Sequence, residues 1–425
     1  MSCDGWVHGP FGVDAQKGMT RATRRTVLAV VHHPSAGARM ADVVPLLESD
    51  PRVQVVFTVP PSIFATGGAD FVRMMGGLTV PWPQATQVPF DLAVTANHGG
   101  LEELNAPVLM LQHGVGFNKY ARRWLGHGAA VAHEGAGIER HRYVHNGRLV
   151  ASVIVLPNEE HVYRLGEGCP EAVPAALVAG DPCYDRLLAS RPARESYRRA
   201  LGVSADERLV VVTSTWGPGS LWGSWVDLPE RLTAELPSNY RVAVILHPMI
   251  WCWHGSRQVR AWYADCLRGG AVLLPPEEGW RAALVAADCV VGDHGSVAYY
   301  AAALGVPVVL GAFPADEVDP EGQVTRFAAI TPRLSPTCPL GEQIRQAMAT
   351  FDSKRYAFVR QQISSVPGDS ARILRRAMYR LMKMVEPVTP PNINRDPMPR
   401  PIRHDYPAAS SLACTSSACG ARTSL

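Results

Sequence analysis

The sequence predicts an α/β protein built from two Rossmann-like domains that face each other across a cleft. Short continuous apolar runs alternate with segments of helical length, which is typical of parallel strands covered by helices on both faces. These runs form two successive series along the chain. The length of 425 residues and the hydrophobic content of 47% are enough for two cores of ordinary size.

The first series predicts an N-terminal Rossmann-like domain over residues 25–174. Its apolar runs are bounded by Gly, Pro or Asp, residues that commonly end strands. An amphipathic stretch through Leu47 follows the first run and predicts a helix. The runs are TVLAVVH (26–32), VQVVFTV (53–59), DLAVTA (91–96) and PVLMLQH (107–113).

The second series predicts a C-terminal Rossmann-like domain over residues 175–365. After it, the segment 366–386 contains a long helical pattern that we expect to cross back and cap the first domain. The apolar runs of this series are AALVAG (175–180), RLVVVTST (208–215), YRVAVILH (240–247), AVLLP (271–275), ADCVVGD (287–293) and PVVLGA (307–312).

Both ends of the chain lack the composition of a packed core. Residues 1–24 are Gly-rich without apolar periodicity, so we expect a flexible leader. Residues 387–425 begin with a Pro-rich stretch and continue as a Ser/Ala/Cys/Thr tail, which predicts disorder.

Composition excludes several classes of protein. The formal charge of +3, from 41 basic and 38 acidic residues, argues against a nucleic-acid-binding protein. Nine cysteines without a C-x-x-C pair support neither a zinc ribbon nor a disulfide scaffold. Apolar runs are too short to span a bilayer, and the N-terminus has no apolar signal stretch. We therefore expect a cytoplasmic protein.

The turn after the run at 287–293 predicts a phosphate site. Ligands of open α/β sheets bind beyond the carboxyl ends of the strands. Here a polar turn leads into a helix of small residues, which we expect Ser296 to cap, and free N–H groups at such a helix start attract phosphate. An ordinary N-cap is the alternative. The residues assigned to donor binding in this turn are Asp293, His294, Gly295, Ser296 and Val297.

Two histidines follow neighbouring strands of the first series. His113 ends one apolar run and is followed by Gly114, which keeps the backbone open. An imidazole there, with a pKa near 6.5, is suited to take a proton from an alcohol. His98 ends the preceding strand and is a second candidate for the cleft. The alternative for each is a structural histidine.

Two further turns belong to the second series. His247 ends a strand in ILHPMIWCWHG (245–255) and is suited to donate a hydrogen bond to a diphosphate. Thr213, Ser214 and Thr215 end another strand, and Trp216 follows them at the expected cleft. A nucleotide-contacting turn is one interpretation of these hydroxyls, and simple loop chemistry is the other.

Several catalytic motifs are absent from the sequence. It contains no D-x-D, which weakens a metal-chelated diphosphate, and no G-x-S-x-G or H-E-x-x-H. We therefore expect no metal and no cofactor. Phosphate charge would be balanced by a helix dipole, backbone amides and basic side chains.

Together these turns resemble those of the CDP-glycerol glycerophosphotransferases, the teichoic-acid polymerase family. GDHGSVAYYAAALGVPVVL (292–310) resembles their T-D-Y-S-S-V…P segment, and QHGVGFNK (112–119) resembles their W-H-G-T-P-x-K turn. LHP (246–248) resembles their second histidine turn, and GDPCYDRL (180–187) resembles the G-x-P-x-x-D segment of their second domain. The layout is shared more loosely with other enzymes of the GT-B fold, including UDP-N-acetylglucosamine 2-epimerases.

The resemblance implies a metal-independent transfer within a GT-B-like fold. It places His113 at the family's proposed base, which would deprotonate the acceptor hydroxyl, and Lys119 at the family's lysine. His294, Gly295 and Ser296 would contact the donor diphosphate, with His247 alongside. The implied partners are a nucleotide-diphosphate donor, CDP-glycerol or a UDP-sugar, and a hydroxyl or lipid-linked acceptor.

This sequence departs from the family pattern at two positions. Tyr300 replaces a carboxylate that is available to the ribose hydroxyls, and Gly295 replaces the first Ser of the pair. A UDP-sugar epimerase or glycosyltransferase of the same fold therefore stays open, as does a catalytically inactive nucleotide-binding protein. The basic stretches TRATRR (20–25) and RILRRAMYRLMK (372–383) offer a peripheral contact with the inner face of the membrane.

Overall fold

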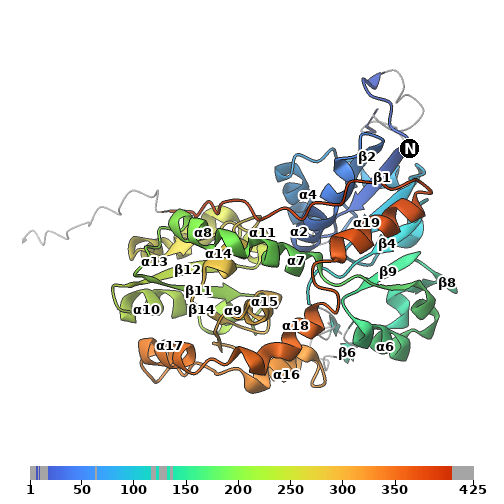
Figure 1. Cartoon of the computed structure of the whole chain (residues 1–425). Helices are drawn as coiled ribbons and strands as arrows, with labels where there is room; N and C mark the ends of the chain where they lie inside the picture. Colours follow the sequence, from blue (N-terminus) through green and yellow to red (C-terminus); the bar gives the residue numbers. More distant parts are fainter. Residues whose placement is uncertain are drawn as a thin grey trace, which may run out of the picture.

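The structure, a computed structural model, consists of two α/β domains (Figure 1). It describes residues 6, 7, 9, 18–62, 65–115 and 137–403, and the backbone of 121–123 and 132–134. Among these residues, no helix combines the length and apolar character needed to cross a membrane.

The first domain is built on a six-stranded sheet with the order β10-β9-β4-β3-β1-β2, in which all paired strands are parallel. The order reverses between β1 and β3, which leaves a crevice at their carboxyl ends. The strands are β1 (Arg25–Val30), β2 (Val53–Thr58), β3 (Leu92–Thr95), β4 (Val108–Met110), β9 (Val153–Leu156) and β10 (Ala176–Val178). Two short antiparallel pairs accompany the sheet: β5 (Ala121–Arg123) with β6 (Ala132–Glu134), and β7 (Val144–His145) with β8 (Arg148–Leu149).

Both faces of this sheet are buried, which explains its continuous apolar strands. One face packs against α2 and α19, whose Leu374 and Met378 are fully buried there. The opposite face packs around Trp82, Phe90 and Leu165. The helices of this domain are α2 (Pro34–Val43), α3 (Pro45–Glu48), α4 (Ala65–Met74), α5 (Trp82–Ala85), α6 (Glu159–Gly168) and α19 (Ser370–Leu381), with 3-10 turns η1 (Leu101–Glu103), η2 (Arg140–Arg142) and η3 (Pro170–Ala175).

The second domain has a five-stranded sheet with the order β13-β12-β11-β14-β15, also parallel throughout. Its order reverses between β11 and β14, so their carboxyl ends border a second crevice. The strands are β11 (Arg208–Ser214), β12 (Tyr240–Leu246), β13 (Val272–Leu273), β14 (Cys289–Gly292) and β15 (Val308–Leu310).

Helices again cover both faces of the second sheet. They are α7 (Pro182–Ser190), α8 (Arg194–Ala200), α9 (Leu221–Ser224), α10 (Leu228–Glu235), α11 (Pro248–His254), α12 (Ser256–Trp262), α13 (Ala264–Arg268), α14 (Trp280–Ala286), α15 (Ser296–Leu304), α16 (Gln323–Ile330), α17 (Leu340–Ala349) and α18 (Ala357–Ile363). The 3-10 turns are η4 (Arg191–Ala193), η5 (Ala315–Glu317) and η6 (Ser353–Tyr356).

The segment GDPCYDRL joins the domains through two caps. The Asp181 carboxylate accepts hydrogen bonds from the backbone N–H groups of Cys183 and Tyr184, which starts α7. The Asp185 carboxylate accepts hydrogen bonds from the backbone N–H groups of Gly368 and Ser370, which fixes the start of α19. The two aspartates therefore set the direction of the chain where it leaves the first domain and where it returns.

The domain boundary differs from the expected one. The run at 175–180 was assigned to the second domain, but β10 pairs with β9 and completes the first sheet. The boundary therefore lies after Gly180, whose φ of +70° turns the chain toward α7. An apolar strand pattern shows that a strand forms and leaves open which sheet it joins.

The expected disorder from residue 387 is wrong for residues 387–403. The backbone N–H of Asp396 donates to Ser190 Oγ at 2.9 Å, and its carbonyl accepts from Tyr197 Oη at 2.6 Å. Its carboxylate lies 2.9 Å from Arg186 Nε. The proline-rich chain is held in place by contacts with α7 and α8 of the second domain. Residues 404–425 lie outside the described residues.

Only part of the expected leader, residues 1–24, is among the described residues. Within it, Val7 exchanges two backbone hydrogen bonds of 2.9 Å with the amide side chain of Gln84. Residues 1–5, 8 and 10–17 lie outside the described residues.

Candidate active site

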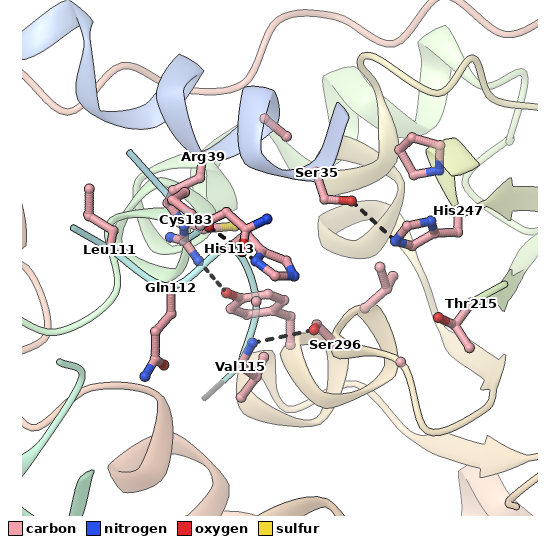
Figure 2. Close-up of a pocket in the computed structure, with 18 of the residues that line it drawn as sticks. Ser35, Arg39, Leu111, Gln112, His113, Val115, Cys183, Thr215, His247 and Ser296 are labelled. Carbon is pink, nitrogen blue, oxygen red and sulfur yellow. Dashed lines mark hydrogen bonds between the residues drawn. The ribbon is translucent and has the colours of Figure 1, made fainter. Parts of the chain in front are cut away.

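A cavity of about 490 Å³ lies between the two domains, at the carboxyl ends of strands from both sheets. Residues of the turns after β3, β4, β11, β12 and β14 line it, so the two crevices form one site. Figure 2 shows Ser35 pointing toward His247 and Val115 toward Ser296, each pair joining the two domains.

His113 lines this cavity after β4, held by a hydrogen bond between its Nδ1 and the backbone carbonyl of Ala96 at 3.1 Å. A carbonyl can only accept, so the neutral ring carries its proton on Nδ1. The lone pair is then on Nε2. This tautomer suits a group that accepts a proton.

His247 lines the cavity from the second domain and has the opposite tautomer. Its Nδ1 accepts from the backbone N–H of Met249 at 3.1 Å, which caps α11. The proton of the neutral ring is therefore on Nε2, which lies 3.2 Å from Ser35 Oγ on α2. His247 is a hydrogen-bond donor at its Nε2.

His98 lines the same cavity after β3. Burial, followed by the nearby Arg142 guanidinium, lowers the pKa of His98 from its ordinary value to about 3. Arg142 Nη1 lies 3.4 Å from His98 Nδ1. His98 is therefore neutral at physiological pH. It can serve the cavity as a hydrogen-bonding group of the first domain.

The sequence interpretation missed His33, which caps α2 by accepting from the backbone N–H of Ala36. Its ring lies 4.7 Å from the His113 ring, edge to face. Burial, followed by the neighbouring histidines, lowers the pKa of His33 to about 2. The run VVHHP (30–34) carried a usable signal, since its two histidines follow the strand that borders the topological switch.

The turn between β14 and α15 supplies the candidate phosphate site. Gly295, not Ser296, is the N-cap residue of α15, and Ser296 is its first helical residue. The expected side-chain cap by Ser296 is therefore wrong. His294, Gly295, Ser296 and Val297 line the cavity at this helix start, where N–H groups lack intrahelical partners.

Asp293 does not line the cavity. Its carboxylate is 1% exposed and accepts hydrogen bonds of 2.8 to 2.9 Å from the backbone N–H groups of Thr215, Leu221 and Gly295. It holds the turn after β11 beside the turn after β14. The Gly295 N–H is committed to Asp293, so the amides of Ser296 and Val297 are the ones placed for an anion.

The last residues of β11 and the residues that follow it line the cavity. Thr213, Ser214, Thr215 and Trp216 all line it. The Ser214 hydroxyl donates to the Thr215 carbonyl and accepts from the Trp222 N–H, so it supports the turn itself. Trp216 is 46% exposed, at the opening of the cavity.

The His113 loop and the start of α15 approach each other closely across the cavity. The Val115 N–H donates to Ser296 Oγ at 3.3 Å. A Cβ at Gly114 would lie 2.9 Å from the same oxygen, so this approach requires glycine. Lys119, the remaining residue expected here, lies outside the described residues.

Three arginines that the sequence interpretation missed also line the cavity, and each is already paired with a carboxylate. Arg39 lies 2.6 Å from Asp181. Arg281 lies 2.8 Å from Asp42. Arg142 pairs with Glu139 at 2.5 Å. Their positions in helices, away from any strand end, gave no sequence signal.

The described residues bring no three His, Cys, Asp or Glu side chains together in a geometry that would hold a metal ion. Imidazoles, hydroxyl and amide side chains, backbone amides and paired arginines are among the polar groups that line the cavity.

Two parallel-sheet domains with their strand ends facing one cavity define the GT-B class of fold. The wall teichoic acid polymerase TagF has this fold: over 85% of this chain and 90% of that one, the TM-score is 0.59 at 12% identity. A second TagF structure, soaked for 15 minutes with CDPG, gives the same TM-score and identity over 87% and 91%. The resemblance seen in the turns is thus confirmed at the level of the fold.

A UDP-GlcNAc 2-epimerase from Neisseria meningitidis aligns with a TM-score of 0.49 and 13% identity, over 84% of this chain and all of that one. No family model matches the sequence. No curated protein matches it either.

Proposed function

We propose that the protein is a metal-independent transferase that moves a glycerophosphate or glycosyl group from a nucleotide-diphosphate donor to a hydroxyl acceptor. One observation carries the proposal: His113 of the first domain and the first turn of α15 of the second domain border the same cavity. A proton acceptor thus lies opposite an anion-binding helix start.

The second domain would hold the donor diphosphate. The N–H groups of Ser296 and Val297 lie at the positive end of α15, and the His247 Nε2–H, which lies 3.2 Å from Ser35 Oγ, would be shared between Ser35 and the diphosphate. Such fixed donors stabilise the charge that develops on a leaving nucleotide, usually the largest contribution to catalysis. Thr213, Thr215 and His294 would complete the donor side.

The first domain would supply the base. With CDP-glycerol as donor, His113 Nε2 takes the proton of the acceptor hydroxyl while that oxygen forms a bond to the β-phosphorus. The bond between the β-phosphorus and the bridging oxygen breaks, and CMP leaves with the electron pair. A positioned base contributes roughly 10²–10⁴-fold to the rate. His98 and Lys119 are proposed for the acceptor side.

Two alternatives use the same cavity. A UDP-sugar epimerase or glycosyltransferase would hold its nucleotide at α15 but act on a sugar carbon. A catalytically inactive protein would bind a nucleotide and turn over no donor. A panel of CDP-glycerol and UDP-sugars, with product chromatography, separates these three.

The decisive experiment compares nucleotide binding with turnover. We expect nucleotide diphosphates to raise the melting temperature, because ligands that bind the folded state stabilise it. His113→Asn keeps a donor for the Ala96 carbonyl but has no proton-accepting nitrogen. It should lower turnover by about 10²-fold or more and leave nucleotide affinity unchanged.

His145→Asn is the matched control, because His145 is an exposed histidine away from the cavity. It should leave both quantities unchanged. Normal turnover by His113→Asn would remove His113 from the mechanism, and the absence of any nucleotide-induced stabilisation would remove the donor site.

A cytoplasmic location with a peripheral contact to the membrane belongs to the same proposal, since a lipid-linked acceptor would be reached from the bilayer surface. The stretch 372–383 does not support that contact well, because its Leu374 and Met378 are buried in the first core. The basic stretch 20–25 remains the candidate.

A further inference from the structure

Tyr300 connects the two domains through hydrogen bonds. It lies on α15, one turn beyond Ser296, and its hydroxyl donates to Asp181 Oδ2 at 2.6 Å. It also accepts from Arg39 Nη2 at 3.2 Å, while Arg39 donates to both Asp181 oxygens. All three residues are at most 6% exposed.

The single proton of the Tyr300 hydroxyl is therefore committed. Burial, and then the Asp181 carboxylate, raise the pKa of Tyr300 well above its ordinary value, so the phenol stays protonated. Asp181 in turn needs this donor and Arg39 to balance its charge in a buried site.

Among the described residues that line the cavity, Asp42 is the only carboxylate. Its Oδ1 accepts from Arg186 at 3.1 Å and from Arg281 at 3.0 Å, and its Oδ2 accepts from Arg281 at 2.8 Å. Its side chain is 1% exposed. Two guanidinium groups occupy three of its roughly four lone-pair positions, and its side chain is buried, so this carboxylate is engaged in ion pairs and poorly accessible to a ligand hydroxyl.

Beside Tyr300 the cavity wall combines apolar side chains with the guanidinium groups of Arg39 and Arg281, each of which is paired with a carboxylate. The Trp280 ring lies 6.1 Å from the Tyr300 ring, and Pro275 and Pro276 line the cavity in the preceding loop. With a diphosphate at the start of α15, these residues form the wall available to the nucleoside. They offer packing, which does not depend on a 2′-hydroxyl.

Nucleotide-binding α/β domains commonly use an Asp or Glu to hold the ribose 2′-hydroxyl. A hydrogen bond to a charged group changes affinity by about tenfold or more. Among the described residues, Asp42, which lines the cavity, and Asp181, which accepts from Tyr300, are both held in ion pairs with arginines. We infer that the site holds the nucleoside without a carboxylate clamp on its sugar and accepts 2′-deoxyribonucleoside diphosphates about as well as ribonucleoside diphosphates. This inference rests on the proposed function.

The test is isothermal calorimetry of the full chain with CDP against dCDP, and with UDP against dUDP. The inference expects dissociation constants within about threefold for each pair. A preference of tenfold or more for the ribonucleotide would overturn it while leaving the proposed function intact. If no nucleotide binds, the proposed donor site fails and the inference falls with it.

A second measurement examines Tyr300 itself. Tyr300→Phe should lower the melting temperature, because Asp181 loses a donor, and should leave the CDP to dCDP affinity ratio unchanged. Tyr356→Phe is the matched control, since it removes another buried phenol hydroxyl from outside the cavity. Weaker binding of CDP but not of dCDP by Tyr300→Phe would show that this hydroxyl contacts the ribose, which would overturn the inference.

Discussion

At the scale of single residues, the partner at Nδ1 decides what each cavity histidine can do. A carbonyl at Nδ1 leaves His113 with a proton-accepting Nε2, and a backbone N–H at Nδ1 leaves His247 with a proton-donating Nε2. The same side chain thus has two roles without a carboxylate to orient it. The backbone turns after β4 and β12 make this distinction.

Ser35 can position His247 only while the two domains are in contact. Its Oγ lies 3.2 Å from His247 Nε2, and the two residues belong to different domains. Ser35→Ala removes one hydrogen bond, typically about 1 kcal/mol, so we expect kcat to fall roughly fivefold. Steady-state kinetics in which the donor and acceptor concentrations are varied separately measure this change in kcat.

Ser35→Thr is the conservative variant for this prediction, since it keeps the hydroxyl. It should restore most of the lost kcat. If Ser35→Thr is as slow as Ser35→Ala, the loss comes from packing and the hydrogen bond to His247 has no role in positioning.

Residues directly after strands were predictable, and residues within helices were not. His113, His247 and Thr215 follow apolar runs, and parallel strands bring their carboxyl ends to one edge. Arg39 and Arg281 lie inside helices, where an arginine ordinarily faces solvent. Arg281 is buried against Asp42 of the other domain, and Arg39 is buried against Asp181 of the segment that joins the domains. No local sequence pattern reveals these pairs.

At the scale of elements, the start of α15 is the feature on which the proposed donor binding depends. Ser296→Ala removes the hydroxyl that lies at the first helical position and contacts the Val115 N–H. We expect the nucleotide dissociation constant to rise about fivefold, the effect of roughly 1 kcal/mol.

Calorimetry with the same nucleotide measures this change. Ser224→Ala, an exposed serine of the same domain that does not line the cavity, is the control and should bind normally. An unchanged affinity in Ser296→Ala would exclude the hydroxyl from donor binding and leave the backbone N–H groups of Ser296 and Val297 as the proposed phosphate donors.

Elements show how far local pattern reaches. The strand at 176–178 was recognised, but its sheet was not, because pairing with β9 is decided by tertiary contact. The chain at 387–403 has the composition of a disordered segment, yet Asp396 is ordered by Ser190 and Tyr197, about 200 residues away in sequence. A composition rule counts only what a segment can bury by itself.

At the scale of the whole molecule, three histidines with lowered pKa values, His161 buried and His33 and His98 half-buried, make the fold sensitive to acid. The folded-state pKa is about 2 for His33 and about 3 for His98 and His161, below the ordinary 6.5. At a pH between the folded-state and unfolded-state pKa values, these histidines are protonated in the unfolded chain but not in the folded one. The free energy of unfolding therefore falls as the pH drops below 6.5. The expected loss is about 1.4 kcal/mol per pH unit for each histidine.

Denaturant unfolding at a series of pH values checks this. His161→Gln changes a histidine outside the cavity and should reduce the dependence on pH by about one proton between pH 4 and 6. A free energy of unfolding that stays constant from pH 7 to pH 5 would contradict the prediction.

The terminal segment should stabilise the arrangement of the domains. Ending the chain after Glu386 removes the hydrogen bonds and the ion pair of Asp396 and the pairing of Ile402 with Leu273. We expect the melting temperature to fall by about 5 °C or more, as for a loss of roughly 2 kcal/mol. Ending the chain after Arg403 is the control and should have no effect; an equal effect of both truncations would contradict the assignment.

The path of this segment limits how the molecule can move. The chain passes from the first domain to the second after Gly180, returns before α19, and crosses again between Ile393, on the first core, and Ile402, on the second sheet. Two domains joined by a single connecting segment can move widely relative to each other, whereas three connecting segments at different points permit only small displacements. We therefore expect substrates to enter and leave through small opening motions of the cavity. A wider separation of the domains would require the segment 393–402 to detach first.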